Sequence, residues 1–187
     1  MKSDGGEFMK ILIVSFDCDA EAAALRAALE WYHADVMIRY IGRPKDFLDV
    51  LEGDVLFSPD VLILCGHGDD GMFLMPELGE DVYLDGEPRN ISPEDVRAHL
   101  KLHPKLCIST ACTSGTPEMG AAFADCGVPY LAPDDYIEGA TPLFFILHMF
   151  YLHLTCGKNF AEAVAIAKTT DSETAMYTFY DGKGGTL

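Results

Sequence analysis

The chain has 187 residues, of which 49% are hydrophobic, and its formal net charge at pH 7 is −17. A chain of this length and composition can bury a core as one domain without metal ions or disulfides. Because the charge is strongly negative, it argues against nucleic acid and anionic membrane surfaces as partners.

The ends and the apolar runs favour a protein without a membrane span. The longest apolar run, residues 142–154, contains His148 and His153 and falls short of the ~20 residues that a span needs. Residues 1–8 lack the apolar centre of a signal peptide, and we expect them to be a disordered leader or a cloning extension. Residues 9–187 then form a single domain. The six cysteines are dispersed without a CxxC pair, which favours a reducing, cytoplasmic compartment.

The first part of the chain alternates apolar runs with helical patterns. We expect strands at residues 10–16, 35–41 and 60–66, because each is a nearly continuous apolar run of strand length. Helices are expected at residues 20–34, which are rich in Ala and Leu, and at residues 44–51.

Residues 69–90 form an irregular stretch in which two apolar triplets stand out. FLM at residues 73–75 and VYL at residues 82–84 are separated by a turn-forming segment with Gly79. This arrangement predicts a hairpin set outside the main sheet.

The second half continues the alternation of strands and helices. Ser92 stands at a helix cap, with Pro93 in the first turn behind it. The expected elements are a helix at 92–100, a strand at 105–111, a helix at 117–126, a short strand at 128–133 and helices at 141–157 and 160–169. Repeated strand–helix units predict an α/β fold, a three-layer α-β-α sandwich with a mainly parallel central sheet.

Chemically useful side chains follow the ends of these predicted strands. In open α/β sheets, ligands bind beyond the carboxyl ends of the strands, where His67 and Cys112 both follow apolar runs. A thiolate with an imidazole close by is what nucleophilic thiol catalysis requires. Gly68 allows a backbone N–H to approach a substrate carbonyl, and Cys112 supplies a second, so the two could form an oxyanion hole.

The motifs around these residues resemble those of the caspase-like cysteine peptidases, a group that contains caspases, metacaspases, gingipains, separase and the bacterial CHAT domains. LILCGHG at Leu62 to Gly68 matches the strand that leads into His-Gly, and LCISTAC at Leu106 to Cys112 matches the strand that leads into the cysteine. GAAFADCGVPYLAPDD and FYLHLTCGKNFAEAVAIAKT then follow in the order typical of CHAT domains. The resemblance runs from about Leu62 to Lys168.

The resemblance implies a caspase-like fold and a cysteine endopeptidase that acts on peptide or protein substrates without a cofactor or metal ion. It makes Cys112 the nucleophile, His67 the second member of a catalytic dyad and Gly68 the oxyanion-hole glycine. The oligomeric state stays open.

The resemblance also suggests where substrate specificity lies. An acidic pocket would select Arg or Lys before the scissile bond, and the candidates are Asp17 or Asp19 after the first strand and Asp134 or Asp135 after the strand at 128–133. Thr110 stands two residues before the cysteine, where metacaspases have Asp.

Three other interpretations compete with catalysis by Cys112. The domain could be a catalytically inactive caspase-like scaffold, or a flavodoxin- or receiver-like binding module with an acidic pocket at residues 17–19. Cys18 lies at the same sheet edge and is a rival nucleophile. Asp69 and Asp70 could bind a cation, although a solvated loop is the simpler interpretation, and Cys65 is expected in the core.

Overall fold

The computed structural model describes residues 8–183 and 185, so the expected leader, apart from Phe8, lies outside the described residues. Six strands form the main sheet in the order β2–β1–β3–β6–β7–β8, in which only β8 runs antiparallel to its neighbour. Their bounds are β1 Lys10–Phe16, β2 Asp35–Tyr40, β3 Val61–Asp69, β6 Leu106–Ser109, β7 Tyr130–Pro133 and β8 Tyr177–Tyr180.

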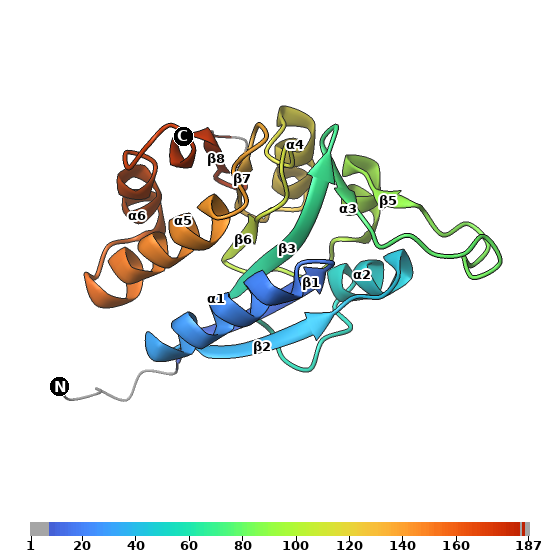
Figure 1. The fold of residues 1–187 in the computed structure, drawn as a ribbon, viewed down its shortest axis with the longest axis horizontal. Coiled ribbons are helices and arrows are strands. Elements are labelled where there is room, and N and C mark those ends of the chain that lie inside the picture. The colour runs from blue at the N-terminus through green and yellow to red at the C-terminus, as the bar shows by residue number, and fades with distance from the viewer. Residues whose placement is uncertain (1–7, 184, 186–187) are drawn as a thin grey trace.

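Helices cover both faces of this sheet, as Figure 1 shows. The helices on one face are α1 (Asp19–Trp31), α5 (Thr141–Phe150) and α6 (Phe160–Ala167), and those on the other are α2 (Pro44–Leu51), α3 (Pro93–His99) and α4 (Pro117–Asp125). Within the described residues, no helix is long and apolar enough to cross a membrane.

Strand alternation explains why the sheet needs two helical layers. In β1, Leu12 and Val14 join the core under α2, α3 and α4, whereas Ile11 and Ile13 join the core under α1, α5 and α6. Both sets of side chains are almost fully buried, because successive residues of a strand point to opposite faces. The predicted three-layer sandwich with a mainly parallel sheet is confirmed.

The structure differs from the sequence-based expectation in the hairpin region. Strand β3 continues to Asp69, and its last residues pair with β4 (Met72–Leu74), which in turn pairs with β5 (Asn90–Ile91). The triplet at residues 82–84 is not a strand. Val82 and Leu84 are about half exposed, so pairing this segment as a strand would not be stabilised by burial in a core. The small sheet therefore uses Asn90 and Ile91 in its place.

Two features near the C-terminus also depart from expectation. The long helix ends at Phe150 and continues as a π-helical turn, η1 (Tyr151–Thr155). Strand β8, which follows the short 3-10 turn η2 (Thr174–Met176), was not predicted, because a four-residue segment carries too little pattern to separate it from a loop. Its Tyr177 lies fully buried in the core.

One ion pair holds the segment between β4 and β5 against helix α2. The Arg43 guanidinium contacts Glu87 at 2.6 Å, and the backbone N–H of Lys45 donates to the same carboxylate at 2.8 Å. The Glu87 side chain is only 2% exposed. Hydrogen bonding to Arg43 lowers the pKa of Glu87 to about 2.

This ion pair makes the stability of the protein depend on pH. Because the Glu87 pKa falls from 4.5 in the unfolded chain to about 2 in the folded one, its contribution is complete above pH 4.5 and disappears as the pH falls towards 2. Urea unfolding should therefore show Glu87→Gln less stable than wild type at pH 6, with the difference shrinking at pH 3. A difference of equal size at both pH values contradicts this.

Candidate functional site

The parallel register of β1, β3 and β6 brings the predicted site residues to one edge of the sheet. Phe16 pairs with Gly66, and Leu64 pairs with Ser109, so the segments after the three strands leave the sheet side by side. The exposed His67 lies on the extension of β3, and the half-buried Cys112 lies in the loop after β6.

Gly68 allows a backbone approach to Cys112 that no other residue permits. A Cβ atom built on Gly68 would lie 2.2 Å from the carbonyl oxygen of Cys112 and 3.0 Å from Cβ of Ala111. A contact of 2.2 Å with backbone is a steric overlap, so a side chain at this position would displace the cysteine loop. The glycine thus keeps the backbone after His67 against the backbone of the cysteine.

The His67 ring makes a polar contact with Cys18. Its Nε2 lies 3.7 Å from Sγ of Cys18, within hydrogen-bonding distance for sulfur. Among the described residues, His67 and Cys112 share no hydrogen bond. The two groups that we expected to form a dyad therefore lie at the same edge without a hydrogen bond between them in the described part of the chain.

The environment of Cys18 keeps its thiol protonated. Burial raises the pKa of Cys18 to about 11, with further contributions from the negative charges of Glu21, Asp17 and Asp19. At pH 7 only about one such thiol in ten thousand is ionised. Cys18 is therefore a hydrogen-bond donor and a poor nucleophile, which argues against it as the rival of Cys112.

The loop after β7 lies over the cysteine loop. The thiol of Cys112 donates to the carbonyl oxygen of Ile137 at 3.8 Å, and the N–H of Thr113 donates to the carbonyl oxygen of Asp135 at 3.2 Å. The Tyr136 hydroxyl donates to the carboxylate of Asp69, beyond His67. That hydrogen bond raises the pKa of Tyr136, since it stabilises the protonated phenol beside a negative charge. One short loop thus bridges the histidine and cysteine segments.

A buried acid beside the cysteine loop was missed by sequence reasoning. Glu21, in the first turn of α1, is largely buried, and burial raises its pKa. Hydrogen bonds with the side chains of Thr110 and Cys65 act in the opposite direction. The signal was its position: Glu21 lies four residues before Leu25, on the stripe of α1 that faces the sheet.

Tyr177 adds a second unusual polar group close to Glu21. Its ring is fully buried and stacks on Phe145 with 3.9 Å between the ring centroids, yet its hydroxyl has no hydrogen-bond partner among residues 8–183 and 185. Burial raises the pKa of Tyr177 well above its usual value, and the nearby charges of Glu21, Cys65 and Cys112 add to the effect. A buried hydroxyl without a partner lowers the stability of the folded state, so the Tyr177 hydroxyl has an unused capacity to form a hydrogen bond with a ligand.

The four aspartates proposed for substrate binding are all exposed, and three accept a hydrogen bond. Asp19 accepts a hydrogen bond from Ser15 at 2.8 Å and Asp134 one from Thr178 at 3.1 Å. Asp135 accepts one from the N–H of Tyr136 at 2.7 Å. Asp17 adopts a left-handed backbone conformation with φ 72° and bridges to Gly66.

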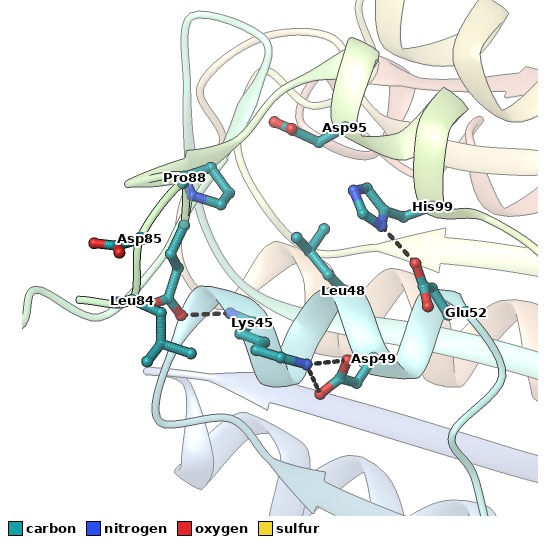
Figure 2. Close-up of a pocket in the computed structure, with 11 residues that line it drawn as sticks. Lys45, Leu48, Asp49, Glu52, Leu84, Asp85, Pro88, Asp95 and His99 are labelled. Carbon is teal, nitrogen blue, oxygen red and sulfur yellow. Dashed lines mark hydrogen bonds and ion pairs between the residues drawn. The ribbon is translucent and has the colours of Figure 1, made fainter. Parts of the chain in front are cut away.

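Other candidate sites in the described part of the chain offer less chemistry. No cluster of three or more potential metal-ligating side chains occurs there, Asp69 and Asp70 included. A cavity of about 360 Å³ lies between α2, α3 and the segment that includes Leu84 (Figure 2). Most of its carboxylates already have partners, such as Lys45 for Asp49 and His99 for Glu52.

Comparisons with known proteins identify the fold. No family model and no curated protein matches the chain. Among solved structures, an inactive zymogen C11 protease from Parabacteroides distasonis matches with a TM-score of 0.51 at 15% identity, over 90% of this chain and 60% of that one. A secreted C11 cysteine protease from Bacteroides thetaiotaomicron, in complex with an irreversible peptide inhibitor, has a TM-score of 0.49 at 10% identity, over 92% and 65%.

A response regulator in red light signalling of R. palustris follows with a TM-score of 0.39 at 15% identity, over 77% of this chain and 93% of that one. The present chain spans less than two thirds of the length of either C11 protease. At these identities the likeness concerns architecture, and it confirms the predicted α/β fold class: the chain has the mostly parallel, helix-flanked sheet of the C11 cysteine proteases.

Proposed function

We propose that this chain is a cysteine peptidase-like hydrolase in which Cys112 is the nucleophile and His67 transfers the proton. The observation that carries the proposal is the close approach of Gly68 to the Cys112 carbonyl, which joins the histidine and cysteine segments at the carboxyl edge of the sheet. The motif order between Leu62 and Lys168 further suggests a likeness to CHAT domains, and the six free thiols suggest a reducing cytoplasm.

The proposed reaction uses only groups of this chain and water. His67 takes the proton of the Cys112 thiol as the sulfur bonds to the carbonyl carbon of the scissile peptide, and the N–H groups of Gly68 and Cys112 donate to the oxyanion that forms. When the intermediate collapses, the C–N bond breaks and the amine leaves with a proton from His67. Water then hydrolyses the thioester, which returns the thiol and frees the acid. For this cycle the His67 ring has to turn from Cys18 towards Cys112.

We infer that substrates carry Arg or Lys before the scissile bond, and that Glu21 recognises it. A buried carboxylate is unfavourable without a cation, and close by Tyr177 offers a hydroxyl that has no partner in the described part of the chain. A guanidinium or ammonium group could satisfy both. The exposed Asp17, Asp19, Asp134 and Asp135 would then attract basic peptides at longer range, as the net charge of −17 also does.

One observation favours an inactive caspase-like scaffold instead. The His67 ring contacts Cys18 and has no hydrogen bond to Cys112 within the described residues. The experiments below separate the two functions, because a scaffold does not hydrolyse peptides.

The first prediction concerns the nucleophile. On a panel of fluorogenic peptides that varies the residue before the cut, Cys112→Ala should lose at least about a thousandfold in kcat, since no other group here can form the acyl-enzyme. Cys156→Ala, an exposed cysteine outside the site, should retain wild-type rates. Cleavage that persists in Cys112→Ala would end the peptidase proposal, and the absence of cleavage by wild type on every peptide would favour the scaffold.

The second prediction concerns the backbone of the oxyanion hole. Gly68→Ala should lower kcat by about tenfold or more, because the added Cβ pushes the Cys112 carbonyl away and misplaces the N–H donors. Gly42→Ala is the matched control, since a Cβ there meets nothing within 4 Å. Equal kcat values for the two variants would show that the close approach has no role in turnover.

The third prediction separates recognition from stability at Glu21. Burial raises the Glu21 pKa, so the ionised carboxylate destabilises the folded state above the unfolded pKa of about 4.5. Glu21→Gln should therefore be more stable than wild type to urea at pH 7, yet lose about tenfold or more in kcat/KM on Arg and Lys peptides. Unchanged preference for basic peptides would assign specificity to other residues.

A further inference from the structure

We propose that Cys18 is a positioning residue whose thiol donates a hydrogen bond to Nε2 of His67 and holds the imidazole away from Cys112 in the resting protein. This proposal rests on the proposed function, in which His67 and Cys112 work together. The observation behind it is the 3.7 Å distance between Cys18 Sγ and His67 Nε2.

The backbone fixes Cys18 at the position where its side chain meets His67. Asp17, one residue before, bridges to Gly66, one residue before His67, so the two chain segments are joined next to the side-chain contact. The carbonyl oxygen of Cys18 accepts from the N–H of Ala22 in the first turn of α1. Cys18 stands at the N-cap of that helix, but its side chain makes no capping hydrogen bond. The thiol is therefore available to the imidazole.

The direction of the hydrogen bond follows from the charges around Cys18. Burial and the three acids Glu21, Asp17 and Asp19 all oppose the thiolate, so the sulfur carries its proton and donates it. A donor at Nε2 requires that nitrogen to be an acceptor, which places the ring proton of the neutral imidazole on Nδ1.

This contact has a consequence for Cys112. A nitrogen that already accepts from Cys18 is engaged and cannot at the same time take the proton of Cys112. The Cys112 thiol meanwhile donates to the carbonyl oxygen of Ile137. Each member of the dyad thus has another partner, and release of His67 from Cys18 is the step that lets the imidazole reach Cys112.

The test measures the reactivity of Cys112 without any substrate. Cys18→Ala and wild type are treated with iodoacetamide at pH 7.5, and the alkylation rate of Cys112 is followed by peptide mass spectrometry. Removal of the thiol frees the imidazole to accept the Cys112 proton, so the rate should rise about two- to tenfold, the range expected for one hydrogen bond. Cys18→Ser, which keeps a donor at this position, should stay near the wild-type rate. Equal rates for wild type and Cys18→Ala would overturn the proposal.

Two controls exclude trivial causes of a faster rate. In a His67→Ala background, Cys18→Ala should have no further effect; an equal acceleration there would mean that the smaller side chain only opened access to Cys112. The fully buried Cys107 should remain unlabelled in every variant, which shows that the fold is intact.

A second readout examines the imidazole directly. In ¹⁵N-labelled protein, the His67 signals are assigned by their loss in His67→Gln, and their shifts report which nitrogen carries the proton. Wild type should show the Nδ1–H form, and Cys18→Ala a shift towards the Nε2–H form. An Nε2–H form in wild type would overturn the proposal. If no variant cleaved any peptide, the proposed function would fail while these two measurements still decided the role of Cys18.

Discussion

The distance between Gly68 and the Cys112 carbonyl oxygen is too short to admit even one methyl group. This constraint ties together two segments that are 44 residues apart in the chain, because β3 and β6 are adjacent parallel strands with fixed register. The extension of β3 carries His67, and β4 pairs with that extension and holds it in place. Any change that separates the two backbones moves the histidine, the cysteine and the N–H donors together. The register of the sheet, rather than any single loop, therefore sets the relative positions of the histidine, the cysteine and the N–H donors.

Burial and negative charge near this edge act on Cys18, and burial acts on Glu21. Glu21, Asp17 and Asp19 all contribute to the raised pKa of Cys18, which leaves that sulfur as a proton donor. The same concentration of acids favours a cationic ligand. Since burial raises the pKa of Glu21, a bound cation would stabilise the ionised carboxylate and remove part of the cost of keeping it there. A charge arrangement that suppresses Cys18 as a nucleophile is therefore consistent with the proposed preference for a basic side chain next to Cys112.

Much of the architecture follows from local sequence patterns, because buried parallel strands are continuous apolar runs. The runs that end near Phe16 and Gly66 gave the correct strands and placed His67 at the right edge. Features that depend on distant contacts could not be found this way. Strand β8 gains its burial only by pairing with β7, and the Cys18–His67 contact depends on the bridge between Asp17 and Gly66. The burial of Glu21 could not be predicted either, because the sequence does not show how far the core covers the first turn of α1.

The loop after β7 gives the resting site a closed form that, under the proposed function, peptide binding has to change. Tyr136 joins Asp69 on the histidine side, and Ile137 accepts from Cys112 on the other, so two adjacent residues connect both halves of the proposed dyad. Tyr136 is 61% exposed, and a hydrogen bond at such a position is worth little against solvent. The Ile137 contact involves sulfur, which is a weak donor. Both links are therefore easily exchanged for contacts to a bound peptide. The same holds for the Cys18 contact, and a substrate that gains only a few hydrogen bonds can reorganise all three.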